Sequence, residues 1–215
     1  MEDIQKQKEG TEFKVLKTIG GSDANKLVLG TYNEWRKIVE DKINEVTTDL
    51  SNVLPVQMGI ATEELNRNWF TMVTGLPVTT SDDIWTDPDK PYAHARVDGL
   101  VHSNEKGDRD GEEGIFEAKH TNPFKPVGDQ VQKYYGQLQH YMNVLDFSLA
   151  YLSIFTGNMN HHIFKVERDD KYIADLVLAE KYLYLCIKDK TIPHFDWYQD
   201  YQKKRKTQYL VEEIA

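Results

Sequence analysis

The stretch that decides the fold is Val97-Asp98-Gly99-Leu100-Val101, followed after a polar loop by Gly114-Ile115-Phe116-Glu117-Ala118-Lys119. Two apolar runs that flank a loop rich in Gly, Asp, Asn and Glu predict a β-hairpin with a long connection. On the second strand Glu117 and Lys119 are two residues apart, so both point to the same face. Asp98 lies on the partner strand, within reach of that face.

Two carboxylates and one ammonium on one side of a sheet cost stability unless something binds there. A divalent cation with oxygen ligands is the natural occupant, and Lys119 would face the anion that the metal polarises. The Glu-x-Lys pattern alone is also typical of a solvated strand with a cross-strand ion pair. The pattern therefore leaves both interpretations open, and the rest of the chain must decide between them.

Composition predicts a folded enzyme-sized domain. The chain has 215 residues and is 40% hydrophobic, with 4 Trp, 12 Tyr and 8 Phe, which is enough for a real core. We expect one domain over residues 1–215, with a flexible polar tail at 1–12 and a basic C-terminal tail at 200–215 that carries Lys203-Lys204-Arg205-Lys206. The single cysteine, Cys186, excludes an internal disulfide and a cysteine-held zinc or iron–sulfur site within one chain.

Net charge and hydropathy limit the kinds of partner that the protein is expected to bind. With 26 Lys+Arg against 35 Asp+Glu the net charge is −9, which argues against indiscriminate coating of nucleic acid but leaves a local basic groove open. No apolar run approaches the length of a membrane span, and the N-terminus is polar rather than a signal peptide. We therefore expect no membrane partner and a cytoplasmic location, in a bacterium or a phage-infected host.

Periodicity and turn residues predict helices before and after the hairpin. The helix that opens after Gly20-Gly21-Ser22 could seat a phosphate or could simply be a capped helix. Gln137 and Tyr141 share one face of a later helix, which could also be an ordinary core helix. Helices are expected at 20–30, 32–46, 57–73, 128–145 and 171–188, the last one final, and strands or extended segments at 13–19, 76–85, 92–95, 147–155 and 161–166.

In this order the chain resembles the PD-(D/E)xK nucleases, and within them the lambda exonuclease or YqaJ-like viral recombinase family. The resemblance implies an α/β (α+β) fold with a central mixed β-sheet flanked by helices, the restriction-endonuclease-like core. Six short motifs carry it from about Ile19 to Tyr172: Ile19-Gly-Gly-Ser-Asp-Ala24, Gly59-Ile-Ala-Thr-Glu63, Val97-Asp98-Gly99, Glu117-Ala-Lys119, Gln137-Leu-Gln-His-Tyr141 and Val166-Glu-Arg-Asp-Asp-Lys-Tyr172.

The resemblance assigns the metal site. Asp98 and Glu117 would bind the metal together with the backbone carbonyl of Ala118, and Glu63 would be the third acidic ligand. Lys119 would orient or help deprotonate the attacking water and steady the charge on the phosphate. Mg²⁺ is the implied cofactor, with Mn²⁺ able to substitute.

The resemblance also assigns DNA contacts. Gln137 matches the family's glutamine after the catalytic strand, Tyr141 its aromatic residue one turn on, and Ser22 a residue placed at the DNA-end phosphate. Val97 stands where the family often has proline, which leaves the ligands unchanged. The family's arginine before the glycine-serine turn has no equivalent in register: the chain offers only Lys14 and Lys17 there, and Lys17 is taken as the candidate for that DNA contact.

The activity that the resemblance implies is a metal-dependent exodeoxyribonuclease acting 5′→3′ on double-stranded DNA ends. It would leave 3′ single-stranded overhangs for phage-type recombination, which a single-strand annealing protein would receive, and a homotrimeric ring would enclose the duplex. Two alternatives remain open from the sequence: a PD-(D/E)xK endonuclease of restriction or repair type, and a non-catalytic DNA-end-binding subunit.

Overall fold

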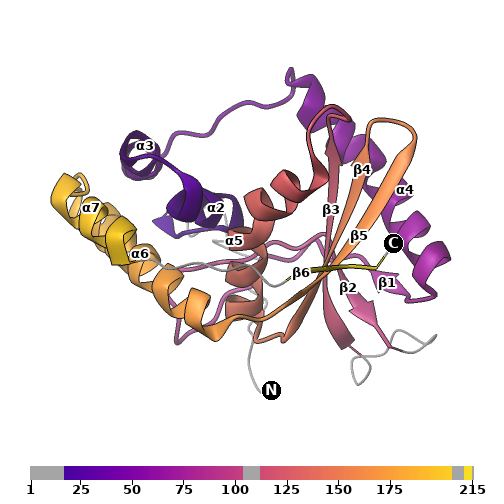
Figure 1. The fold of residues 1–215 in the computed structure, drawn as a ribbon. Helices are drawn as coiled ribbons and strands as arrows, with labels where there is room; N and C mark the ends of the chain where they lie inside the picture. Colours follow the sequence, from indigo (N-terminus) through magenta and orange to yellow (C-terminus); the bar gives the residue numbers. More distant parts are fainter. Residues whose placement is uncertain (1–16, 104–111, 205–210, 215) are drawn as a thin grey trace.

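A six-stranded mixed sheet forms the centre of the protein (Figure 1). The computed structural model describes residues 17–103, 112–204 and 211–214. The strands lie side by side in chain order, and only β3 and β4 run parallel. This confirms the predicted mixed sheet. The strands are β1 (Val78–Thr79), β2 (Gly99–His102), β3 (Glu112–Thr121), β4 (Leu149–Thr156), β5 (Asn160–Glu167) and β6 (Val211–Glu213).

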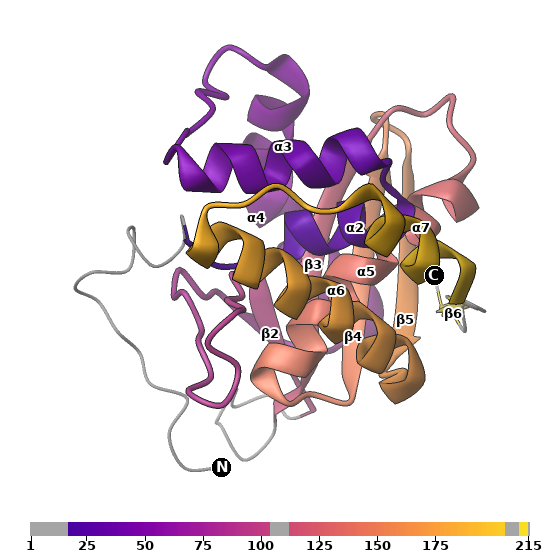
Figure 2. The same cartoon turned by 90° about the vertical axis from the view of Figure 1, so that its left-hand side faces the viewer.

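Helices cover both faces of the sheet in layers. One face carries α4 alone. The other carries α5, on which α2 packs, and α3, α6 and α7 form the outer layer (Figures 1 and 2). The parallel pair β3–β4 needs a crossover connection, and α5 supplies it. The helices are α2 (Gly21–Leu29), α3 (Tyr32–Ile43), α4 (Leu54–Thr74), α5 (Val127–Leu145), α6 (Asp170–Asp189) and α7 (Phe195–Lys204).

Alternation along the strands divides the core in two. Side chains at odd and even positions of β3 point to opposite faces, so Ile115 joins the core under α5 while Phe116 joins the core under α4. On the α4 side the Phe70 ring meets Phe116 edge-on, with 5.2 Å between ring centroids. This alternation sends Glu117 and Lys119 toward α5, as the two-residue spacing predicts.

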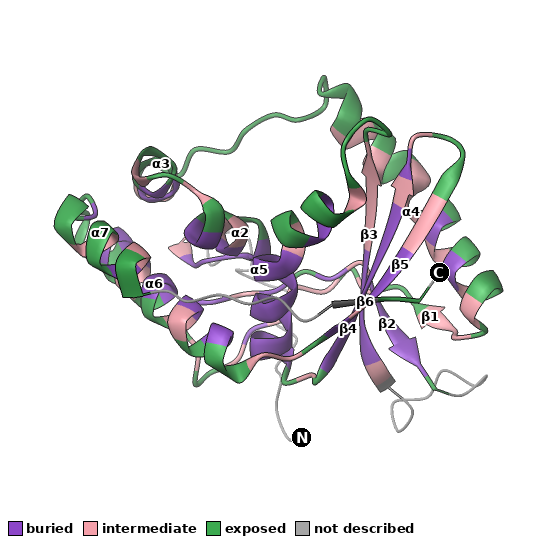
Figure 3. Cartoon of the chain, viewed as in Figure 1, coloured by how far each residue is buried: buried purple, intermediate pink, exposed green. Residues whose placement is uncertain are grey.

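Helix α5 is buried on every side from Tyr135 to Leu145 (Figure 3). It lies between the sheet and the outer helices, so its polar side chains are enclosed and need partners inside the protein. Gln139 donates to the carbonyl of Glu167 at 2.8 Å and accepts from the amide of Asp169 at 2.8 Å. Polar groups on this helix are therefore held in fixed orientations.

The segment between α4 and β2 contains less strand than expected. Of residues 76–85 and 92–95, Val78–Thr79 pairs with β2, while Trp85 and Ala95 form an isolated bridge. Asp- and Pro-rich turns interrupt the extended backbone and prevent a longer ladder. Of the strand expected over 13–19, residues 13–16 lie outside the described residues, and residues 17–19 contain only one isolated bridge, from Ile19 to Ala93.

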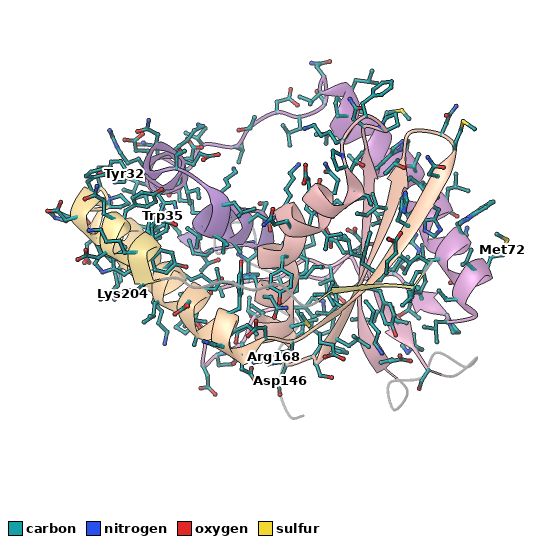
Figure 4. All side chains as sticks on the ribbon, viewed as in Figure 1. Tyr32, Trp35, Met72, Asp146, Arg168 and Lys204 are labelled. Atoms are coloured by element: carbon teal, nitrogen blue, oxygen red, sulfur yellow. The ribbon has the colours of Figure 1, made fainter. Side chains whose placement is uncertain are left out.

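The C-terminal segment differs from the expected basic tail. Helix α6 is followed by α7, so it is not the final helix, and β6 adds a strand beside β5. Aromatic residues of α7 hold it against α3: Tyr198 meets the Trp35 ring edge-on at 5.1 Å between centroids, near the labelled Tyr32 in Figure 4. The tail prediction is thus corrected for 200–204 and 211–214, whereas 205–210 and the predicted tail at 1–12 lie outside the described residues.

No helix within the described ranges combines the length and the apolar character that crossing a membrane requires.

Candidate active site

Asp98 lies where the ladder between β2 and β3 ends. The last paired residues are Gly99 and Phe116, and beyond them Asp98 Oδ2 accepts a hydrogen bond from the amide of Ala118 at 2.8 Å. The side chain thus replaces the next backbone partner. Because the N–H and C=O of one strand residue point to the same side, the carbonyl of Ala118 also points toward Asp98's side of β3.

Glu117 and Lys119 meet on the face toward α5, as predicted. Lys119 Nζ donates to Glu117 Oε1, and Gln137 Nε2 donates to the same oxygen at 2.6 Å. Glu117 is only 2% exposed, and its other oxygen, Oε2, has no hydrogen-bond partner among the described residues. A buried carboxylate oxygen without a donor is costly in a folded protein and is frequent at functional sites.

Electrostatics at this site are strongly perturbed. Burial raises the pKa of Glu117 to about 8, and the negative charge of Asp98 adds to the shift. Burial alone would lower the pKa of Lys119, but the carboxylates of Glu117 and Asp98 outweigh it and raise that pKa. Lys119 therefore keeps its positive charge at neutral pH. Perturbed titrating groups gathered in one place are a recognised mark of active sites.

Glu63 approaches the same place from α4, on the other side of β3. Burial raises the pKa of its carboxyl, with Asp98 as the second cause. Arg67, one helical turn on, places Nη1 3.4 Å from Glu63 Oε1 and 3.4 Å from the backbone oxygen of Asp98. Arg67 thus links the two acidic positions. The sequence reasoning missed it, since its only signal is the four-residue spacing from Glu63.

Asn66 fixes α4 against the sheet. Its buried amide donates to the carbonyl of Lys119 at 3.3 Å and to that of Ser153 at 3.1 Å, so one side chain joins α4, β3 and β4. Nearby, Thr62 Oγ1 and His120 Nδ1 are 3.1 Å apart. These contacts position the turn of α4 that carries Glu63.

The start of α2 packs closely on α5, which explains its two glycines. A Cβ at Gly21 would lie 2.5 Å from Cε1 of the Tyr141 ring, and neither Gly20 nor Gly21 has a positive φ. The glycines therefore permit close approach of the two helices. Asp23 caps the helix by accepting from the amide of Gly20 at 3.0 Å, which leaves Ser22 exposed.

Asn25 holds Gln137 at two points. Asn25 Nδ2 donates to Gln137 Oε1 at 3.1 Å, and Asn25 Oδ1 accepts from the backbone amide of Gln137 at 2.7 Å. The Gln137 carbonyl oxygen is therefore occupied, and its NH₂ group points to Glu117 and to the hydroxyl of Tyr141, 2.8 Å away. The sequence reasoning missed Asn25, whose pairing with a residue 112 positions away leaves no local pattern.

A cavity of about 900 Å³ gathers these groups. It brings together six of the predicted site positions: Ser22, Glu63, Asp98, Ala118, Lys119 and Gln137. Glu117 lies directly behind this wall, in contact with Lys119 and Gln137, and Tyr141 lies behind Gln137. Tyr134 of α5 also lines the cavity.

Lys17 does not join the cavity. Its ammonium lies 2.7 Å from Glu45 Oε1 and donates to the carbonyl of Lys42 at 3.4 Å, on the side of α3. Four other lysines line the cavity: Lys26, Lys119, Lys125 and Lys133. The basic groups available to a bound anion are thus different from the one that the sequence suggested.

The donors suit a hard divalent cation. The carboxylates of Glu63 and Asp98 and the carbonyl of Ala118 are all oxygen donors, and Glu117 Oε2 lacks a hydrogen-bond donor. Repulsion from Asp98 raises the pKa of both glutamates, which a cation would relieve. Within the described ranges no three His, Cys, Asp or Glu side chains already stand together at metal-binding spacing. The site therefore suits a divalent cation by the chemistry of its oxygen donors, and not by a cluster of side chains already at ligand distances among the described residues.

The fold and this site define a PD-(D/E)xK-type α+β core. The chain belongs to the family of the YqaJ-like viral recombinase domain, whose model matches residues 9–157. No curated protein matches the chain.

Solved structures share this fold. The alkaline exonuclease LHK-Exo from Laribacter hongkongensis is 17% identical over 84% of this chain and 93% of its own, with a TM-score of 0.64. The same enzyme in complex with dAMP is 18% identical over the same shares, with a TM-score of 0.65. A phage-related exonuclease from Haemophilus somnus 129PT is 14% identical over 81% of this chain and 96% of its own, with a TM-score of 0.60. At these identities the likeness establishes the fold alone.

Proposed function

We propose that this protein is a Mg²⁺-dependent exodeoxyribonuclease that hydrolyses phosphodiester bonds at double-stranded DNA ends. The observation that carries the proposal is the convergence of Glu63, Asp98 and Lys119 on one cavity, with Glu117 directly behind them. Carboxylates beside a charged lysine suit phosphodiester hydrolysis, in which a cation and an ammonium stabilise a phosphate that gains negative charge. Family membership and the exonuclease fold support the same class of activity.

Glu63, Asp98, Glu117 and the carbonyl of Ala118 would hold the metal. When bound, Mg²⁺ supplies Lewis-acid stabilisation of the phosphate and a more acidic water. The protonated Lys119 orients the attacking water and stabilises the charge on the phosphate. Gln137 donates to Glu117 and so fixes the direction of that carboxylate, while Asn25 fixes Gln137 in turn.

We infer 5′→3′ polarity, with the remaining 3′ strand passing to a single-strand annealing protein. Ser22 supports this assignment, because it lies on the cavity wall in the first turn of α2, whose free N–H groups favour a phosphate. Lys17 lies outside the cavity, with its ammonium beside Glu45 and the carbonyl of Lys42. We therefore assign the neighbouring charge to Lys26, which lines the cavity on the same helix.

We also propose a homotrimeric ring around the duplex. A chain with a net charge of −9 is poorly suited to hold DNA by diffuse attraction, since counterion release requires Lys and Arg against phosphates. Enclosure removes that need and makes digestion processive. Light scattering tests this directly: a ring gives about three times the mass of the 25.0 kDa chain, whereas a monomer that still digests processively contradicts it.

The activity is tested with linear duplex labelled at one 5′ or one 3′ end, in Mg²⁺ and in EDTA. The proposal expects rapid release of the 5′ label as mononucleotide in Mg²⁺ alone, with the 3′-labelled strand outlasting it. Covalently closed circular duplex is the control, because an exonuclease leaves it intact and an endonuclease of restriction or repair type cuts it. Binding of ends without digestion under all conditions would instead identify a non-catalytic subunit.

A further inference from the structure

Phe124 is the most exposed large apolar side chain in the described part of the chain, at 92%. Isolated exposed apolar residues are common, so exposure alone carries no inference. Phe124, however, stands between Asn122 and Lys125, which both line the cavity of the candidate active site. An unburied aromatic ring between two residues of the cavity wall has a specific chemical use.

The turn that carries Phe124 is firmly built. Asn122-Pro123-Phe124-Lys125 follows the residue preferences of a β-turn, with Asn first and Pro second. Asn122 Oδ1 accepts from the amide of Phe124 at 2.8 Å, and the carbonyl of Asn122 accepts from the amide of Lys125 at 3.3 Å. Two hydrogen bonds thus close the turn, while the ring that it carries contacts solvent.

The neighbouring β4–β5 turn supports this platform. The amide of Gly157 donates to the carbonyl of Thr121 at 2.9 Å, and the Cα of Gly157 lies against the Pro123 ring, where an added Cβ would come within 3.0 Å. The contact with the Pro123 ring and one backbone hydrogen bond therefore support the turn from behind. Phe124 is left as the outward-facing group of a rigid support.

The surroundings are suited to a phosphate strand. Lys133 Nζ lies 4.8 Å and Lys119 Nζ 5.0 Å from the centre of the Tyr134 ring, so cations and an aromatic ring alternate along this wall. Lys125 follows Phe124 directly and extends the basic wall. Basic side chains that track a backbone, with aromatic rings on which bases stack, are the means by which proteins hold single-stranded nucleic acid.

We propose that Phe124 stacks on an unpaired nucleobase of the DNA strand entering the cavity, while Lys125 pairs with an adjacent phosphate. This inference rests on the proposed nuclease function and adds to it a base-stacking contact outside the cleavage site. An exonuclease that feeds one strand of a duplex into a cavity must expose bases at the end. A ring held in solvent beside the entrance stabilises such a base and is tolerant of sequence.

The test is a binding measurement in EDTA, where no cleavage occurs, using fluorescence anisotropy of a duplex with a short 5′ overhang. An abasic site is moved through the first nucleotides of that strand. For the wild-type protein, one abasic position should weaken binding by about tenfold, the magnitude of one lost base–aromatic stack. Phe124→Ala should show the same weakening on intact DNA and no further loss at that abasic position, because the two changes remove one interaction.

Matched variants separate stacking from general effects. Phe124→Tyr should bind like the wild type, whereas Phe124→Leu, which keeps apolar bulk without a ring, should bind like Phe124→Ala. Lys125→Ala should lower the slope of log affinity against log salt by about one, and Phe124→Ala should leave that slope unchanged. Met72→Ala is the control for removing an exposed apolar side chain: Met72 is 63% exposed at the far end of α4 (Figure 4) and should have no effect.

The inference is overturned if Phe124→Ala binds like the wild type, or if its loss adds fully to that of every abasic position. A failure of the proposed function is distinct from this result. In that case the wild-type protein would not digest linear duplex in Mg²⁺, whatever the Phe124 variants do in EDTA.

Discussion

Two buried glutamates of this protein look alike in isolation and differ in their surroundings. Glu117 accepts from Lys119 and Gln137 on one oxygen, and Glu180 on α6 lies 2.6 Å from His140 Nδ1. In each carboxylate the second oxygen has no hydrogen-bond partner among the described residues. Burial, a nitrogen partner on one oxygen and a second oxygen without a partner among the described residues are thus common to both.

The two sites differ in solvent access and in neighbouring charge. His140 and Glu180 are both fully buried between α5 and α6, and His140 Nε2 is satisfied by the carbonyl of His94 at 2.8 Å. Lys119, in contrast, is 22% exposed and lines a large cavity with the further carboxylate of Asp98. The comparison teaches that a buried acid marks a candidate active site only where a cavity and like charges accompany it.

The largest difference between the two regions should appear when Lys119 is replaced. Lys119→Ala removes the ammonium group that contacts Glu117 and lines the cavity, so the rate of duplex digestion should fall by about 10³-fold. The variant should still bind Mg²⁺, because no oxygen ligand is lost. Single-turnover digestion and calorimetric Mg²⁺ titration measure the two effects, and a wild-type-like rate would remove Lys119 from the catalytic assignment.

The stability of the folded protein should depend more on Glu180 than on Glu117, the reverse of the order expected for activity. Glu180→Gln leaves His140 without its counter-charge in a closed interior, so the free energy of unfolding should drop by about 3 kcal/mol. Glu117→Gln should change it by less than about 1 kcal/mol, because the substitution removes a carboxylate that burial already disfavours and Lys119 can reach solvent. Urea unfolding of the two variants measures both values, and an equal loss would contradict the comparison.

Variants of Gln137 and Asn25 test whether these residues hold the Glu117 carboxylate in position for the reaction. Gln137→Ala should lower the digestion rate about 30-fold, since Glu117 loses a donor that fixes its direction. Asn25→Ala should lower the rate about tenfold by freeing the Gln137 amide to rotate, while Asn25→Asp, which keeps one acceptor for the Gln137 backbone, should be intermediate. If either residue is merely structural, the loss of rate will instead follow the loss in melting temperature.

The smallest expected effect is a change in the free energy of unfolding with pH, through His140. Burial alone would lower the pKa of His140, but the charge of Glu180 and their hydrogen bond raise it above its usual value. A raised folded-state pKa means that the folded protein binds the proton more tightly than the unfolded chain. The stabilisation that this proton gives to the folded protein is complete below a pH of about 6.5 and is lost as pH rises through the folded-state pKa of His140. The loss is at most about 1.4 kcal/mol per pH unit.

Unfolding free energies between pH 6.5 and 9 check this expectation. The wild type should lose more stability over that range than Glu180→Gln, because the variant no longer holds the proton on His140. Subtraction of the two curves removes the contribution of Glu117, whose pKa of about 8 acts in the same direction in both proteins. Parallel curves would show that His140 is neutral in the folded protein.

Much of the fold follows from local patterns. The alternation around Glu117, the capping residues before Lys171 and the glycine at Gly30 are short-range signals, and the corresponding elements lie close to the predicted positions. The parallel pairing of β3 and β4 also follows from the helix between them. Strand β6 and the packing of α7 on α3 are long-range contacts, so a pattern read along the chain indicates neither of them.

The same distinction applies to the candidate site. Asp98, Glu117 and Lys119 are identified by a motif, and the structure brings them together. Asn25 and Arg67 have no motif of their own and acquire their places through contacts with distant residues. Lys17 illustrates the converse: position along the sequence favours it, but its ammonium is engaged by Glu45 on another element.

The central claim is that Glu117, and not Glu180, belongs to the reacting site. Both glutamine variants should be assayed beside the wild type on end-labelled linear duplex in Mg²⁺, at a temperature where circular dichroism shows all three folded. We expect no detectable digestion by Glu117→Gln and a wild-type rate for Glu180→Gln. Digestion by Glu117→Gln at a rate near that of the wild type would contradict it.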